Sequence, residues 1–298
     1  MMEYIPAKTI LSPWHEGGWF GSNYGMNLYK GCCHGCIYCD SRSECYQIAD
    51  FDRVRTKEDA LEILARDLKS KRKKGMVITG AMSDPYNPFE KQLCLTRRAL
   101  MLLDQYGFGV AINTKSPLVT RDLDVLLSVR RHSPVTVGIT ITTADDNLCR
   151  KIERYVPPSS RRFSALETLA RGGVNCGVLL MPLLPFINDT EENISAIVHR
   201  AAKAGAKWIF AYPDMGVTLR QNQRGYFYDR LDESFPGLKK RYMDTFGNQY
   251  GCASPRHEAL WAHLIRECEK TGLLYRMEDI AESLHAPYRM EQISLFSE

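Results

Sequence analysis

Strand-like and helix-like segments alternate along most of the chain, and this alternation limits the possible folds more than any other feature. The expected strands span residues 24–30, 76–80, 109–114, 135–141, 175–181 and 208–212. The expected helices span residues 56–72, 96–106, 120–130, 161–170 and 189–205. Such alternation is typical of an α/β fold with a parallel sheet covered by helices. The periodicity leaves open whether that sheet is open or closed into a barrel.

The helix expected over residues 56–72 carries the clearest boundary signals. Thr56, with Asp59 three residues later, resembles a capping box. Leu64 and Leu68 lie on one apolar face, as a helix that packs on a sheet requires. Gly75 follows the pattern and indicates its end.

Three cysteines follow the first expected strand. Cys32, Cys36 and Cys39 form the pattern Cys-x3-Cys-x2-Cys. Three thiolates can hold three irons of a [4Fe–4S] cluster and leave the fourth iron without a protein ligand. An open coordination position can bind a further molecule, whereas a closed one is usually structural. The spacing therefore predicts an iron–sulfur centre with an open iron.

A zinc site is the alternative interpretation of the same loop. Structural zinc needs a fourth ligand, which Cys33, His34 or Cys45 could supply. Cys33 could also replace Cys32, because Cys33, Cys36 and Cys39 form the evenly spaced pattern Cys-x2-Cys-x2-Cys. A non-catalytic metal-binding or redox-sensing protein is the function that this alternative predicts.

The loops after the later strands carry polar residues. Parallel strands end at one edge of their sheet, so these loops should lie beside the cysteine loop. Ser83 and Asp84 follow the second strand, Lys115 follows the third, and Thr140 lies at the end of the fourth. Taken singly, each signal also fits an ordinary turn or an exposed side chain. Together they predict a ligand site on the face that holds the cysteines.

Composition indicates a globular protein of a reducing compartment. The chain has 298 residues, of which 44% are hydrophobic, so a large core can form. The net charge of +4 does not by itself indicate a nucleic-acid partner. Its 10 cysteines follow no disulfide framework. Neither a signal peptide nor an apolar run of membrane length is found, so we expect a cytoplasmic protein without a membrane anchor.

The order of these motifs resembles that of one family. The cysteine loop, Ser83-Asp84-Pro85, Lys115, Thr140 and a Met-Pro segment near residue 181 occur as in the spore photoproduct lyase-like branch of the radical S-adenosylmethionine (SAM) enzymes. The resemblance covers roughly residues 4–215. It implies a partial (β/α)6 barrel of the TIM type over residues 1–215, with the cluster loop at 30–40. Residues 216–298 would form a C-terminal extension packed on this core.

The resemblance also implies two cofactors, a [4Fe–4S] cluster and SAM. The family pattern has a three-residue gap, which favours Cys32 over Cys33 as the first ligand. An electron from the cluster would cleave SAM to methionine and a 5′-deoxyadenosyl radical. An external donor of the flavodoxin or ferredoxin type would supply that electron.

The SAM contacts implied by the resemblance come from loops after several strands. Lys115 would meet the SAM carboxylate. The amino-acid part or the ribose would be lined by Ser83, Asp84 and Thr140. The adenine would lie between Leu180 and the backbone of Tyr38. Neither the residues nor the resemblance assigns a catalytic residue that acts on the substrate.

Two positions depart from the spore photoproduct lyase pattern. Ala81 stands where those enzymes carry a hydrogen-donating cysteine, and Asp40 stands where they carry a tyrosine linked to radical relay. Alanine has no hydrogen that is abstracted as easily as that of a thiol. Cys45 or Cys94 could replace the missing thiol. We therefore expect the radical-generating chemistry without thymine-dimer repair.

Two segments of the extension suggest partners. Arg220, Arg224 and Tyr226 interleave basic and aromatic side chains, which suits single-stranded nucleic acid but also a solvated helix face. The leading substrate is therefore DNA or RNA, and the alternatives are a protein or a small metabolite. The segment from Gln292 to Phe296 resembles a peptide that docks on the DNA sliding clamp. It could instead tuck its apolar side chains into the chain's own barrel.

Overall fold

The computed structural model describes residues 2–14 and 18–289 of the chain. The segment expected to bind a sliding clamp, residues 292–296, lies outside the described residues. No helix within the described part is long and apolar enough to cross a membrane.

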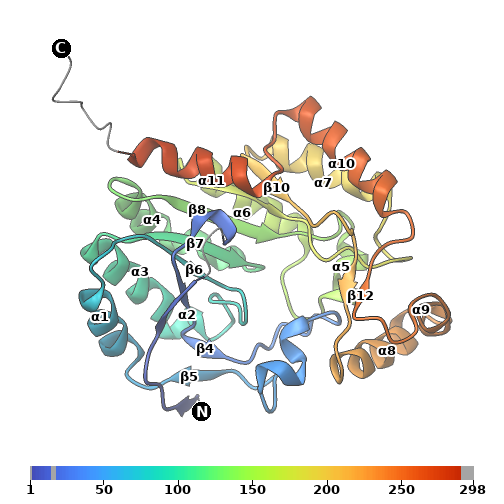
Figure 1. Cartoon of the computed structure of the whole chain (residues 1–298), viewed down its shortest axis with the longest axis horizontal. Coiled ribbons are helices and arrows are strands. Elements are labelled where there is room, and N and C mark those ends of the chain that lie inside the picture. The colour runs from blue at the N-terminus through green and yellow to red at the C-terminus, as the bar shows by residue number, and fades with distance from the viewer. Residues whose placement is uncertain (1, 15–17, 290–298) are drawn as a thin grey trace.

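Six parallel strands form the centre of the fold (Figure 1). They lie in a seven-stranded sheet of order β10-β9-β8-β7-β6-β3-β2. The parallel strands are β3 (Tyr24–Met26), β6 (Met76–Thr79), β7 (Gly109–Thr114), β8 (Val135–Thr140), β9 (Asn175–Leu179) and β10 (Trp208–Phe210). β2 (Leu11–Pro13) joins one end of the sheet antiparallel to β3. Since the described strands β10 and β2 end the sheet without pairing to each other, the barrel is partial, which confirms the predicted fold class.

Helices cover the outer face of this sheet (Figure 1). Those that follow strands are α1 (Ala60–Ser70), α3 (Leu95–Tyr106), α4 (Leu123–Arg130), α6 (Ser159–Arg171) and α7 (Glu191–Lys203). Their apolar faces share one core with the outward side chains of the strands, such as Val110 and Ile209. The connecting loops hold α2 (Glu90–Leu93), α5 (Asp146–Ile152), and the short 3-10 turns η2 (Asp40–Arg42), η3 (Glu44–Tyr46) and η4 (Pro117–Asp122).

The first expected strand and the first expected helix are placed differently from the prediction. The strand over residues 24–30 is divided into β3 and β4 (Tyr29–Lys30). β4 pairs with β5 (Arg55–Lys57), which also pairs with β1 (Glu3–Ile5) in a small second sheet. Thr56 lies inside β5 opposite Tyr29, so the predicted capping box is wrong. The β-branched Thr56 is stabilised by strand pairing on both sides, and α1 begins only at Ala60.

The C-terminal residues pack around and inside the barrel. They form β11 (Val217–Thr218), α8 (Gln223–Ser234), α9 (Leu238–Phe246), β12 (Gly251–Cys252), α10 (His257–Thr271), α11 (Met277–His285) and the turn η5 (Ala286–Tyr288). α10 lies beside α7 (Figure 1). Ile280 of α11 shares the inner core with Trp208 of β10 and with Phe20 of the turn η1 (Trp19–Gly21). The division of the chain after residue 215 therefore stays a prediction, because the last helix helps to fill the barrel.

Candidate active site

The cysteine loop is held in shape by backbone contacts. Cys32 N–H donates to the carbonyl of Phe51 at 2.8 Å, and Ile37 N–H donates to that of Ile152 at 2.9 Å. Gly31 has φ +82°, and a Cβ there would meet the Arg53 carbonyl at 2.6 Å, so this turn requires glycine. The loop conformation is thus set by the protein chain on both sides of the three cysteines.

Cys32, Cys36 and Cys39 surround one small cavity of about 100 Å³. All three are free thiols, and His34 lines the same cavity. Cys33 and Cys45 do not line it, which favours Cys32 over Cys33 as a ligand. Within the described ranges, no group of three or more His, Cys, Asp or Glu side chains is arranged to hold a single metal ion. A [4Fe–4S] cluster differs in this respect, because each thiolate binds a separate iron.

Cys32 and Cys36 are buried, and Cys39 is partly buried. Burial raises the pKa of the Cys32 thiol to about 12. It also raises the pKa of Cys36 and that of Cys39, although nearby Lys115 acts in the opposite direction on both. A positively charged metal centre is therefore required to hold these groups as thiolates at neutral pH.

A larger cavity of about 530 Å³ adjoins the cysteines. Four of the six predicted SAM-binding residues line it: Tyr38, Lys115, Thr140 and Leu180. Gly80, Ala81 and Asn113 lie on the wall that the two cavities share. The buried Oδ1 of Asn113 has no hydrogen-bond partner in the described structure. This free acceptor, beside three thiols and an ammonium group, fits a cluster in the small cavity and SAM in the large one.

Lys115 is partly buried and lines both cavities. Its Nζ lies 5.7 Å from the centre of the Tyr38 ring. Burial lowers the pKa of Lys115, whereas Cys36 and the Glu153 carboxylate raise it, and the net shift is upward. Lys115 therefore stays a cation in this site, as binding of a carboxylate requires.

Ser83 and Asp84 line the small cavity but not the larger one. Asp84 accepts hydrogen bonds from Thr114 Oγ1 at 2.6 Å, from Lys115 N–H at 2.7 Å and from Tyr86 N–H at 2.9 Å. Ser83 Oγ donates to the carbonyl of Tyr29 at 3.1 Å. In this structure both residues connect neighbouring loops, and their contact with SAM stays a prediction.

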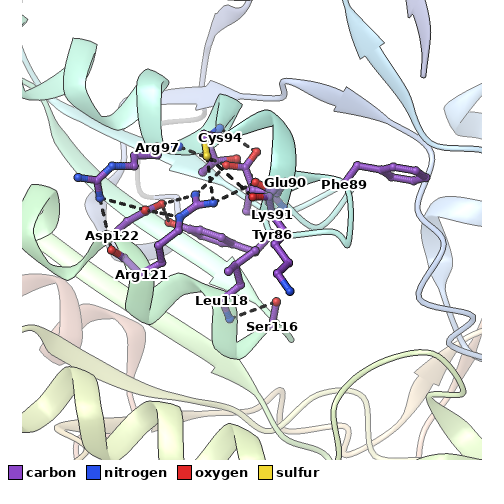
Figure 2. A network of polar contacts seen from close by, with 12 residues as sticks. Tyr86, Phe89, Glu90, Lys91, Cys94, Arg97, Ser116, Leu118, Arg121 and Asp122 are labelled. Atoms are coloured by element: carbon purple, nitrogen blue, oxygen red, sulfur yellow. Dashed lines mark hydrogen bonds and ion pairs between the residues drawn. The ribbon is translucent and has the colours of Figure 1, made fainter. Parts of the chain in front are cut away.

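A buried polar network includes Tyr86, which follows Asp84 by two residues (Figure 2). Glu90 has no exposed side-chain surface and pairs with Arg121 at 2.9 Å. Tyr86 donates to Asp122, which also pairs with Arg121. Cys94 accepts a weak bond from Arg121 within this network and lines neither cavity. Sequence reasoning missed the network, because only folding brings Glu90 beside Asp122.

The extension also reaches the site. The buried Gln223 of α8 donates from Nε2 to the Tyr38 carbonyl at 3.0 Å. Arg220 pairs with Asp40 at 2.8 Å and donates to Cys45 Sγ at 3.0 Å. Cys45 is exposed and does not line the cavity, although Asp40 does. Thus Asp40, one of the two positions that depart from the spore photoproduct lyase pattern, forms an ion pair with the extension.

The arrangement defines a class of protein, an α/β barrel with a cysteine-bound cofactor site at the carboxyl ends of its strands. The family described as the radical SAM superfamily matches residues 26–197, and the chain belongs to it. The family uses a [4Fe–4S] cluster and SAM, so the predicted cofactors and the prediction of an enzyme are confirmed.

Relatives by sequence include proteins of an archaeon and of a bacterium. The uncharacterized protein MJ0683 of Methanocaldococcus jannaschii is 34% identical over 190 residues, which are 63% of this chain and 69% of that protein. The uncharacterized protein Rv2578c of Mycobacterium tuberculosis is 28% identical over 249 residues, which are 81% of this chain and 72% of that protein.

The fold is similar to that of spore photoproduct lyase. A mutant of that enzyme with bound AdoMet and dinucleoside spore photoproduct superposes with a TM-score of 0.64. The two chains are 14% identical, and the match covers 85% of this chain and 76% of the other. At this identity the likeness shows a shared fold, which confirms the branch resemblance at the level of architecture.

Proposed function

We propose that this radical SAM enzyme modifies or repairs a nucleic acid and that one nucleobase of the substrate enters the larger cavity. The observation that carries the proposal is an aromatic wall formed by Trp14, Trp19 and Tyr212, which line the cavity together with the cysteine loop. The Trp19 ring lies 6.1 Å from that of Tyr212 and 5.7 Å from that of Phe210. Aromatic walls of this kind stack well on the planar face of a base.

The cofactors define the reaction class, and the chain's residues hold them. When bound, the cluster and SAM supply an electron transfer and a 5′-deoxyadenosyl radical that abstracts hydrogen from the substrate. Cys32, Cys36 and Cys39 would hold the cluster, and Lys115 would pair with the SAM carboxylate. Asn113 Oδ1 offers an acceptor to the SAM amine.

Two further observations shape the substrate proposal. Spore photoproduct lyase, which shares the fold, binds a dinucleoside photoproduct. In this chain Ala81 lines both cavities without a thiol, so we propose a reaction other than thymine-dimer repair. A base that is damaged or single-stranded enters such a cavity at the lowest unstacking cost.

A free planar metabolite is the second candidate substrate, and the extension favours it. Arg224 donates to the carbonyls of Leu219 and Gly247 at 2.9 Å, and Arg220 pairs with Asp40. These arginines contact the protein itself and do not form an open phosphate-binding groove. A nucleic-acid substrate would therefore have to be held mainly through the base in the cavity.

The test is turnover under anaerobic conditions. The reconstituted enzyme, dithionite and SAM are incubated with single-stranded DNA or RNA, and 5′-deoxyadenosine is quantified. We expect oligonucleotides to stimulate its formation and deuterium from labelled oligonucleotides to enter it. Absence of 5′-deoxyadenosine with an intact cluster would contradict the enzyme assignment. Formation that no oligonucleotide stimulates would favour the metabolite instead.

Trp19→Ala tests the aromatic wall separately. Loss of one stacking partner should weaken oligonucleotide binding about tenfold, since base stacking contributes about 1–3 kcal/mol. Trp261→Ala is the matched control, because Trp261 packs against Tyr275 of the extension and lines neither cavity. Equal effects of the two substitutions would refute a base on this wall.

Three further assignments are proposals as well. Radical SAM enzymes need an electron donor, and we propose an external flavodoxin or ferredoxin for this chain. We propose a cytoplasmic location, which the ten free cysteines support. Docking on the sliding clamp would depend on Leu295 and Phe296. Clamp retention by the wild type but not by Leu295→Ala would support it, and equal retention would contradict it.

A further inference from the structure

Behind the cysteine loop lies a buried cluster that consists of Tyr38, Cys149, Glu153 and Arg162, here called the Glu153 cluster. Glu153 pairs with Arg162 Nη1 at 2.6 Å, and neither side chain has exposed surface. The Tyr38 hydroxyl donates to the other carboxylate oxygen of Glu153. Cys149 Sγ lies 3.6 Å from Glu153 Oε2. A buried ion pair with this many partners is costly to form and is weak evidence of stabilisation, which points to another role.

The Glu153 cluster is attached directly to the metal-binding loop. Cys36 and Glu153 pair in an antiparallel backbone bridge. Next to this bridge, the N–H of Tyr155 donates to the His34 carbonyl at 3.0 Å. On the other side, Arg162 donates to the carbonyl of Thr140 at 3.0 Å. The Glu153 cluster therefore joins the cysteine loop to the end of β8, whose Thr140 lines both cavities.

Both members of the ion pair are charged. The Arg162 guanidinium is always protonated, and its Nη1 lies 2.6 Å from the Glu153 carboxylate. The carboxylate raises the pKa of Arg162 above its ordinary value even though burial acts against this. A fixed charge in a buried region acts on its neighbours through little screening. The negative charge of Glu153 therefore acts on whatever Cys36 binds.

We propose that Glu153 is a positioning residue of the metal site with two effects. Through the Tyr38 hydroxyl it fixes the loop that carries Cys36 and Cys39. Through its negative charge it lowers the reduction potential of the cluster. This inference rests on the cluster of the family and is independent of whether the substrate is a nucleic acid.

The charge effect is tested with Glu153→Gln in the reconstituted full-length enzyme. The reduction potential is measured by redox titration followed by the electron paramagnetic resonance signal of the reduced cluster. We expect a shift to more positive potential, because a neutral side chain leaves the positive charge of Arg162 uncompensated. Glu90→Gln is the matched control: Glu90 is equally buried and also accepts from a tyrosine, Tyr29, and pairs with an arginine, Arg121. Equal shifts in the two variants, or no shift in Glu153→Gln, would overturn the charge effect.

The positioning effect is tested with Tyr38→Phe, which keeps the ring packing and the charge of Glu153. The loss of the iron–sulfur absorbance is followed after addition of a chelator. Because phenylalanine cannot donate the hydrogen bond to the buried Glu153 carboxylate, we expect cluster loss to be about tenfold faster than in the wild type. Tyr29→Phe, which removes the bond to Glu90, should stay close to the wild-type rate. Equal rates in Tyr38→Phe and the wild type would overturn the positioning effect. This test does not depend on whether Glu153→Gln folds.

Discussion

Asp84→Ala is the substitution that best separates a structural role from ligand binding in this site. Asp84 is 8% exposed, and its carboxylate accepts three hydrogen bonds of 2.6–2.9 Å from Thr114, Lys115 and Tyr86. A hydrogen bond to a charged group contributes about 1.5 kcal/mol or more. Removal of all three should therefore lower the free energy of unfolding by about 3–5 kcal/mol, since buried donors lose their acceptor. The apoprotein should already show this lower free energy of unfolding, because the three hydrogen bonds form without a bound cofactor.

The measurement is urea denaturation of the apoprotein under reducing conditions, followed by far-ultraviolet circular dichroism. Asp84→Asn should lose less, about 1–2 kcal/mol, because one amide oxygen can still accept from Thr114 while the amide nitrogen faces the Lys115 N–H. Asp145→Ala is the control, because Asp145 is an exposed helix N-cap whose carboxylate accepts from Asn147 N–H at 2.6 Å. Its free energy of unfolding should fall by about 1 kcal/mol. If Asp84→Ala unfolded within about 1 kcal/mol of the wild type yet lost SAM binding, the structural role would be refuted and the predicted SAM contact supported.

Three further predictions concern the cavity wall, alkaline stability and the extension. Gly80→Ala should lower the free energy of unfolding by more than about 2 kcal/mol and abolish SAM binding in equilibrium dialysis. The reason is that Gly80 has φ +95° and the new Cβ would lie 1.9 Å from the Asn113 carbonyl oxygen. Gly107→Ala, with φ +73° and open space around the new Cβ, should lower stability less, and equal losses would contradict the prediction. Burial raises the pKa of Cys176 to about 12, so between about pH 9 and 12 the unfolded state binds fewer protons than the folded state. The free energy of unfolding of the apoprotein should therefore fall as pH rises through this range. Cys176→Ala should make that fall shallower, and an unchanged slope would contradict the reasoning. Gln223→Ala should speed chelator-induced cluster loss, because it removes the 3.0 Å bond to the Tyr38 carbonyl, whereas Gln92→Ala on α2 should have no effect.

Local patterns predicted the parts of the fold that depend on neighbouring residues. The strands expected over residues 109–114 and 135–141 match β7 and β8 (Val135–Thr140), because both are rich in apolar and β-branched residues and are buried along their whole length. α7 lies within the helix expected over residues 189–205, and Thr190 caps it, since its side chain accepts from Asn193 N–H. The prediction at Thr56 is wrong because pairing with Tyr4 and Tyr29, both far along the chain, outweighs a capping signal.

Spacing likewise predicted which thiols gather but not what supports them. Cys32, Cys36 and Cys39 are close in the chain, so their meeting at one cavity follows from a short loop. The hydrogen bond from Tyr38 to Glu153 spans 115 positions, and no sequence period connects them. The same holds for Gln223, whose side chain reaches Tyr38 across 185 positions.

By itself, the sequence determined an α/β chain with a three-thiol loop at the active edge of a parallel sheet. Strand period, helix period and cysteine spacing are local properties that need no knowledge of the fold. Only the tertiary structure decided that Asp84 connects loops, that the arginines of the extension contact the protein itself, and that Glu153 and Arg162 lie buried behind Cys36. These roles depend on burial and on partners brought together from distant parts of the chain, because an ionisable side chain acquires its function from the charges and donors that surround it.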